Sequence, residues 1–343
     1  MLFSCLSEGI KHRIVDTSYQ ARSSRYVPNS LGLRSQTLKL RFVTPETQGL
    51  FLKPTISQGD MVEFVEGQYG DSLPKPVFDR FFLGNTLSQI YAPYYVDGGK
   101  IFDAVLNRAV FDKTEIEGEP FSHSEKAPHW RIRFVPALCP ACGWDLEGER
   151  DALALHCTNC NSIWHQGKEG FTKLTFGHFR ADNEQIQFLP FWRIKAEISG
   201  IALHSYADLV RLANLPKVVQ DEWTEREFRF WSPAFKVRPQ DFLKFAQYLT
   251  LTQPCEEIVS GLPKGGMYPV TLAFSEAIEG LKVILASFMK PQKILFPKLP
   301  EIRIKAKSLF LVFIPFRMKG NELSQPDYRL RINKNLMTYA RRL

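Results

Sequence analysis

Four of the six cysteines in this 343-residue chain form two pairs whose spacing could bind a metal ion. The first pair is Cys139 and Cys142, the second is Cys157 and Cys160, and two residues separate the members of each pair. Such a pair lets a tight turn direct both sulfurs at one ion, and the fourteen residues between the pairs allow a strand out and a strand back. Because four thiolates close a tetrahedron, we expect one structural zinc ion, Zn²⁺, and no catalytic metal.

The residues after each pair support this interpretation. Gly143 and Asn161 are residue types that tolerate the positive φ such turns often need. The segment around residues 136–166 resembles the zinc-ribbon family with rubredoxin-like knuckles, and the resemblance implies that the four cysteines are the ligands. The spacer is shorter than in many ribbons, which shortens the hairpin but keeps the site. Zinc is preferred to iron because no redox partner motif accompanies the cysteines.

The resemblance covers about 30 residues and implies no single activity. The family serves transcription, replication and translation proteins, and also enzymes and assembly factors in which the ribbon is only structural. We expect the ribbon to project from a larger β-rich protein. Trp144 and Trp164 should pack over it, because so small a module has little other core. His156 and His165 are expected to face solvent rather than replace a cysteine.

Composition predicts an α+β, β-rich fold with packing helices. Aromatic residues make up 13% of the chain and the 22 Pro are spread along it, which favours many short strands and turns. The length exceeds that of one hydrophobic core. We expect an N-terminal β-rich lobe (1–125), an inserted zinc ribbon (126–175) and a C-terminal α+β lobe with basic strands (176–343).

Short internal similarities favour a duplication of the two lobes that flank the ribbon. Three segments, beginning at Tyr91, Phe188 and Phe313, share an apolar-x-Pro-aromatic pattern, and each is expected to begin a strand. Residues 37–41 and 234–238 form a second similar pair.

Helical spacing of apolar residues predicts three packing helices. Asp241 could cap a helix that buries Phe242 and Leu249, another should begin near Ser275, and a third candidate covers 205–213.

The net charge of +8 is unevenly distributed. Residues 290–343 hold 13 Lys and Arg against three acidic residues, a net +10, so the other 289 residues carry −2. This asymmetry indicates an anionic partner, either nucleic acid, an anionic membrane surface or an acidic protein. The alternative is a solvated face that keeps the protein soluble.

Alternation of apolar and basic residues in 301–307 and again in 328–333 predicts two strands that each present cations on one face. If these strands are neighbours, their cations form one basic patch. Its members would be Arg303, Lys305, Lys307, Arg317, Lys319, Arg329 and Arg331.

The apolar run from Leu309 to Phe316 has eight residues and contains Pro315, so it predicts a buried strand rather than a transmembrane segment. The N-terminus does not have the pattern of a secretory signal. Paired cysteines suit a reducing compartment, and we expect a cytoplasmic protein.

Recognised catalytic and cofactor motifs do not occur: the chain has no H-E-x-x-H, no phosphate-binding loop and no G-x-S-x-G. We therefore name no catalytic residue and infer no small-molecule substrate. The preferred hypothesis is a non-catalytic zinc-binding structural or interaction protein, part of a larger assembly with a protein partner. Phe228, Phe230 and Trp231 are candidates for its contact surface, with burial in the core as the alternative. The other hypotheses are a nucleic-acid-binding accessory protein, which would use the basic sheet and the ribbon, and an enzyme of unrecognised class.

Overall fold

The computed structural model describes most of the chain as two compact units. One unit comprises Met1–Ile14, Pro74–Asn85 and Val135–Leu343, and the other comprises Val15–Leu73 and Thr86–Phe134. The expected N-terminal lobe is therefore divided between the units, and the three-domain division stays a prediction. The described residues are 2–13, 47–52, 74–84, 91–112, 124–125, 135–167, 170–181 and 185–341.

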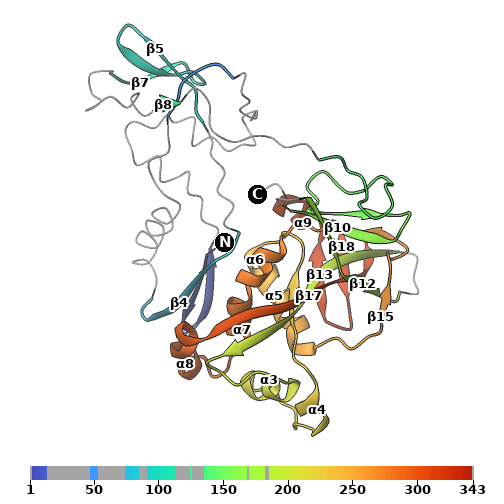
Figure 1. Ribbon diagram of the computed structural model, residues 1–343. Coiled ribbons are helices and arrows are strands. Elements are labelled where there is room, and N and C mark those ends of the chain that lie inside the picture. Colours follow the sequence, from blue (N-terminus) through green and yellow to red (C-terminus); the bar gives the residue numbers. More distant parts are fainter. Residues whose placement is uncertain are drawn as a thin grey trace. The chain divides into compact units, whose positions relative to one another are not determined.

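The smaller unit contains strands only, among its described residues (Figure 1). Strands β5 (Tyr94–Asp97), β6 (Lys100–Asp103) and β7 (Arg108–Asp112) form an antiparallel sheet, and β3 (Phe51–Leu52) pairs with β8 (Ser124–Glu125). As expected, a strand begins directly after the proline of the first apolar-x-Pro-aromatic segment. The proposed repeat at 37–41 lies outside the described residues.

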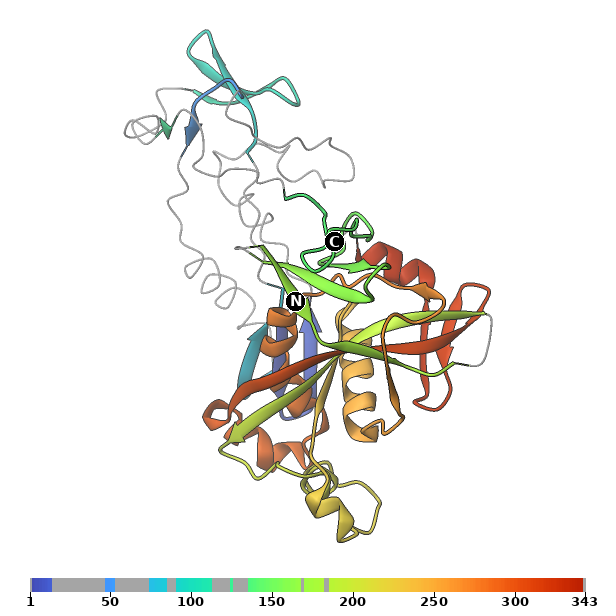
Figure 2. The same cartoon turned by 45° about the vertical axis from the view of Figure 1, so that its right-hand side comes forward.

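The larger unit is built on one sheet with the order β14-β13-β17-β12-β15, to which β16, β18 and β19 are added. Figure 2 shows β13 and β17 as the two longest strands, crossing the centre of this unit. Strands and helices together confirm the α+β, β-rich class. The strands are β12 (Phe176–Phe179), β13 (Ile186–Ser199), β14 (Phe230–Pro233), β15 (Ile258–Ser260), β16 (Gly266–Met267), β17 (Arg303–Lys319), β18 (Glu322–Gln325) and β19 (Leu330–Asn333).

The two other proline segments lie inside strands, not at their beginnings as the sequence suggested. Pro190 pairs with Phe313 and Pro315 pairs with Phe188 in the antiparallel β13–β17 ladder. The carbonyl of Pro190 accepts from the Ala234 N–H at 3.0 Å, on the side of β13 away from β17. In an antiparallel strand, the backbone N and O of one residue point to the same side of the strand. The missing N–H of Pro190 therefore removes no hydrogen bond between β13 and β17.

These central strands have matching neighbours. Along β13, the parallel strand β16 pairs nearer the beginning and the antiparallel strand β14 pairs further along. Along β17, the parallel strand β12 likewise pairs before the antiparallel strand β18. Strand β12 precedes β13 in the chain but pairs with β17, and β16 precedes β17 but pairs with β13. This matching arrangement of strands around β13 and β17 lies within residues 176–325. A duplication of the lobes that flank the ribbon stays a prediction.

Helices pack where apolar periodicity predicted them. Ser205 and Asp208 form a capping box at the start of α3, whereas α5 begins after Arg238, and Asp241 in its first turn pairs with that arginine instead of capping. The helix predicted to begin near Ser275 is divided at Gly280 into α6 and α7. The helices are α3 (Tyr206–Leu212), α4 (Glu222–Glu225), α5 (Pro239–Thr252), α6 (Phe274–Glu279), α7 (Leu281–Phe288), α8 (Gln292–Leu295), the 3₁₀ helix η4 (Phe296–Glu301) and α9 (Lys334–Ala340).

The core of the larger unit is rich in aromatic residues. Phe191 of β13 contacts Phe245 of α5 and Phe316 of β17, at ring-centre distances of 6.1 and 6.2 Å. The candidates for a contact surface, Phe228, Phe230 and Trp231, are at most 5% exposed, which confirms the alternative that they belong to the core. Strands β1 (Leu2–Leu6), β2 (Gly9–Arg13) and β4 (Val77–Phe82) form a separate sheet whose side chains join this core.

Candidate metal centre

The four paired cysteines meet at one point. Their Sγ atoms all lie within 4.8 Å of one another, with Cys139 and Cys160 at 3.5 Å and Cys142 and Cys157 also at 3.5 Å. Among the described residues, this is the group of side chains that could hold a metal ion. The arrangement can bind one ion through four sulfur ligands, as the spacing predicted.

Each pair is held by a turn that needs an unusual backbone angle. Gly143 has φ +73° and its N–H donates to the Cys139 carbonyl at 2.8 Å, while the Cys139 N–H donates to the Trp144 carbonyl at 2.7 Å. In the second pair, Asn161 has φ +49°. Left-handed angles are accessible to glycine and, at lower frequency, to asparagine, so the sequence places permissive residues where the turns require them.

Short strands connect the two turns. Strands β9 (Ala154–Cys157), β10 (Ser162–Gly167) and β11 (Gly170–Leu174) form an antiparallel sheet, and Cys157 ends β9 just before the second turn. The chain after the first turn joins this sheet through paired hydrogen bonds between Glu147 and His156. The four cysteines are therefore held on two hairpins fixed by backbone bonds.

The hydroxyl of Ser162 completes the surroundings of the sulfurs. Its Oγ lies 3.0 Å from the Cys160 Sγ and 3.7 Å from the Cys139 Sγ, and it accepts from the Trp164 Nε1 at 2.8 Å. Ser162 is fully buried and was not among the residues expected at the site. The sequence contains only a weak indication of this role, since Ser162 is a small polar residue two positions after a cysteine.

The thiols ionise unequally. Partial desolvation opposes ionisation of Cys139, but the N–H groups of Ala141 and Cys142 and the Ser162 hydroxyl outweigh it and lower the pKa of Cys139 to about 6. For Cys160 the Ser162 hydroxyl favours ionisation, yet desolvation and the three neighbouring thiols raise its pKa to about 11. Four thiolates this close repel one another, so the full set forms only around a cation.

A small apolar cluster packs beside the sulfurs. Leu146 and Trp164 are buried with Cys139 and Cys157, which confirms that Trp164 packs on the ribbon. The same expectation is wrong for Trp144, which is 57% exposed because the indole of Trp164 already fills this cluster.

The two histidines do not join the cysteines. The expectation that they face solvent is wrong, because each has a partner within the protein. The His156 Nε2 lies 3.8 Å from a carboxylate oxygen of Glu147. The His165 Nδ1 contacts the Leu153 carbonyl at 2.9 Å, and its ring meets Phe274 of α6 at 5.1 Å.

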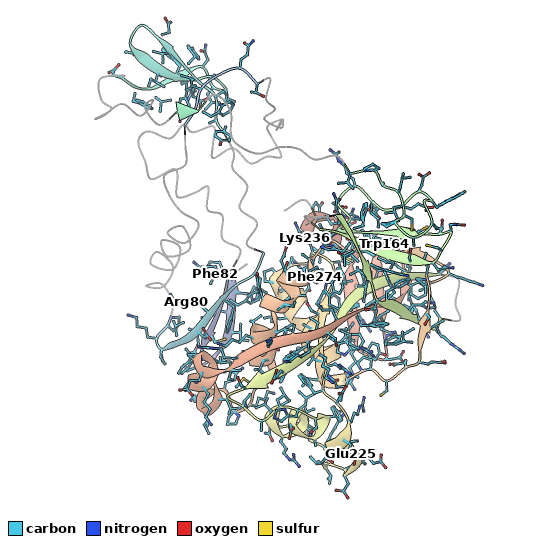
Figure 3. All side chains as sticks on the ribbon, viewed as in Figure 1. Arg80, Phe82, Trp164, Glu225, Lys236 and Phe274 are labelled. Atoms are coloured by element: carbon cyan, nitrogen blue, oxygen red, sulfur yellow. The ribbon has the colours of Figure 1, made fainter. Side chains whose placement is uncertain are left out.

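The ribbon lies against the rest of its unit, the body, so the expectation that it projects is wrong. The Leu153 N–H donates to the Val270 carbonyl at 2.8 Å, and Ala154 and Ile163 belong to the main core. Figure 3 shows Phe274, at the start of α6, near the ribbon strand that carries Trp164. The ribbon has apolar side chains on the face opposite its own cluster, and burying them favours docking.

A charged contact closes the same interface. The Arg341 guanidinium binds Glu149 at 2.6 Å and Asp151 through its Nε at 2.7 Å, and it lies 5.6 Å from the ring centre of Tyr268. This arginine lowers the pKa of Asp151. The segment that leads to β9 is thus fixed to the end of α9.

The predicted basic residues are exposed but do not form one row. Arg303, Lys305 and Lys307 begin β17, beside the end of β13. The other four lie at the far end of β17 or near β19, and β19 pairs with β18 rather than with β17. Ten residues of strand, about 33 Å, separate Lys307 from Arg317.

A β-bulge separates the two groups further. Opposite Lys195 and Ala196 of β13 stand Ser308 and Ala306 of β17, so Lys307 is the extra residue. One extra residue reverses which side chains point to each face of the sheet. The cations of the first group therefore point to one face of the sheet, and Arg317 and Lys319 to the opposite face.

No helix among the described residues has the length and apolar character that crossing a membrane requires. Comparisons of the chain with protein-family models, with curated proteins and with solved structures find no match.

Proposed function

We propose that this protein is a non-catalytic, zinc-binding structural or interaction protein that works as a component of a larger assembly. The observation that carries the proposal is the group of four cysteine sulfurs within 4.8 Å of one another. Four thiolates fill a tetrahedron and leave no position for a substrate or an activated water. The metal would therefore contribute folding free energy to the ribbon.

Zinc is the ion that suits this site. Thiolate sulfur is a soft ligand, and a tetrahedral set of four is typical of structural Zn²⁺. Reduced thiols are also required, and we accordingly propose a reducing compartment such as the cytoplasm.

An interaction role is supported by two exposed apolar side chains beside the first turn of the ribbon. Trp144 is 57% exposed and Leu138 is 50% exposed. The chain near them is fixed by the Cys139–Trp144 backbone bond, so ordering this surface on binding costs little entropy. Aromatic side chains of this kind are enriched where proteins bind each other.

The test measures the metal first. Purified protein should contain one equivalent of zinc by elemental analysis and native mass spectrometry, and the double variant Cys139→Ser/Cys157→Ser should contain none. Cys255→Ser is the matched control, since Cys255 is exposed and outside the cluster. Undiminished zinc in the double variant would refute the site, and iron in its place would refute the identity of the ion.

Nucleic-acid binding by an accessory protein is the second candidate function. It is supported by the net +10 of residues 290–343 and by the exposure of the cations at both ends of β17. Neutralised phosphates release counterions, so affinity for labelled single-stranded or double-stranded oligonucleotides should fall steeply as salt increases. Absence of binding at low salt would remove this candidate and leave the first.

A further inference from the structure

The beginning of β17 is one part of a larger cationic surface that the sequence did not reveal. In the β13–β17 pairing, Glu197 stands opposite Lys305 and Ser199 opposite Arg303, and Lys307 binds Glu197 at 2.5 Å. Residues two apart on a strand share a face, which adds further cations of β13. We call the basic face the set Arg193, Lys195, Arg303, Lys305 and Lys307 together with Arg229, which directly precedes β14 and shares Glu227 with Lys195.

Two acidic residues hold this set together without neutralising it. Glu227 pairs with both Lys195 and Arg229, and Glu197 pairs with Lys307. Six cations against two carboxylates leave four positive charges in excess. Neither Arg193 nor Lys305 forms an ion pair with any residue in the described part of the chain, so both can accept an external anion.

Arg193 adds a planar group to the charges. Its guanidinium carbon lies 5.2 Å from the ring centre of Phe310, the residue opposite it on β17. Partial burial, and then the nearby charge of Arg229, lower the pKa of Arg193, although an arginine keeps its charge. A guanidinium positioned over an aromatic ring is a surface on which a nucleic-acid base can stack.

We propose that the basic face binds single-stranded nucleic acid, with a base stacked at Arg193 and phosphates along Lys195, Lys305 and Arg303. This proposal rests on the second proposed function and assigns it to one surface. From Arg193 to Ser199 the strand advances about 20 Å, enough for about six stacked nucleotides. The basic face is only two to three β-strands wide, about 10 to 15 Å, which suits a single nucleic-acid strand better than a duplex.

Two matched double variants test the location. Arg303→Glu/Lys305→Glu changes the basic face, and Arg317→Glu/Lys319→Glu makes the same charge change on the same strand, beyond the bulge and on the opposite sheet face. Binding of a labelled 12-nucleotide single strand is measured across a salt series. Loss of two phosphate contacts should reduce the salt slope by about 1.4 in the first variant, with little change in the second.

A third variant tests the stacking. Arg193→Lys keeps the charge but removes the planar group, so we expect about a tenfold loss of affinity with an unchanged salt slope. Arg303→Gln/Lys305→Gln repeats the first test without placing new carboxylates beside Glu197. Thermal melting and zinc content establish that each variant is folded.

The outcomes separate this inference from the function on which it depends. If the unaltered protein binds no nucleic acid at low salt, the second proposed function and this inference both fail. If it binds, but the far-end variant loses affinity and the basic-face variant does not, the function stands and the location is wrong. Tighter binding of duplex, or equal binding of a polyglutamate peptide, would overturn the assignment of a single strand.

Discussion

The ribbon and the body to which it docks are stabilised in different ways. The body buries a continuous core of aromatic and aliphatic side chains, whereas the ribbon's own cluster has four buried members, two of which are cysteines of the candidate metal site. A core that small supplies little folding free energy. The ribbon must therefore rely on its docking interface and on the proposed ion, while the body relies on packing.

If the proposed ion is bound, its removal should have the largest effect, and only on the ribbon. Structural zinc contributes about 10 kcal/mol or more of apparent binding free energy in small metal-dependent modules. In Cys139→Ser/Cys157→Ser, or after a strong chelator, we expect rapid proteolytic cleavage within 139–162 while the body stays resistant. Limited proteolysis read by mass spectrometry measures this, and equal protection of the ribbon without metal would contradict the comparison.

A core substitution should have the opposite distribution. Phe191→Ala removes a ring that is fully buried between α5 and β17, and should lower the free energy of unfolding by about 3 to 5 kcal/mol. Denaturant unfolding followed by circular dichroism checks the value. Zinc content should remain at one equivalent, and loss of the metal together with the core would show that the regions are not independent.

The next effect concerns the group that orients the sulfurs. Ser162→Ala removes the hydroxyl beside Cys139 and Cys160 and leaves the Trp164 Nε1 without its acceptor. Groups of this kind typically alter metal affinity 10- to 100-fold, and we expect about a tenfold loss of zinc affinity in a chelator competition. Ser287→Ala, in a helix of the body, is the control. Unchanged affinity would assign the hydroxyl a role in packing only.

The smallest effect is expected at the charged contact between the regions. Arg341→Ala should lower the free energy of unfolding by about 1 kcal/mol, because the carboxylates it binds are partly exposed. The pKa of Asp151 is lowered from 3.8 in the folded protein, so its contribution is present above pH 3.8 and lost as the pH falls further. A comparison of thermal stability near pH 7 and pH 3 should show a smaller decrease in the variant. If the variant and the unaltered protein lose the same thermal stability between pH 7 and pH 3, carboxylates other than Asp151 cause the loss.

Local chemistry made the clustering of the four cysteines predictable. Cysteine spacing, Gly143 and Asn161 act within a few residues, so the sequence contains the signal for the two turns that bring the sulfurs together. The packing helices were predictable for the same reason, since a helical face is read from neighbouring positions.

Features set by pairing between distant strands were not predictable. Nothing in the alternation of residues 301–307 shows that Lys307 is bulged, because the extra residue is defined only by its partners on β13. Docking of the ribbon likewise depends on Val270 and Phe274, more than a hundred residues after the first cysteine pair.

The pairing of β12 with β17 and of β16 with β13 has a consequence for folding during synthesis. Neither long strand has all its partners until both have been made. Strand β13 is synthesised roughly a hundred residues before β17, its main partner, and translation at about 5 to 20 residues per second delays that partner by about 5 to 20 s. During this interval a 14-residue strand rich in large apolar side chains has no complete sheet to join. Until its second half has emerged, a nascent chain of this design exposes unpaired strand edges and apolar side chains, which favour aggregation.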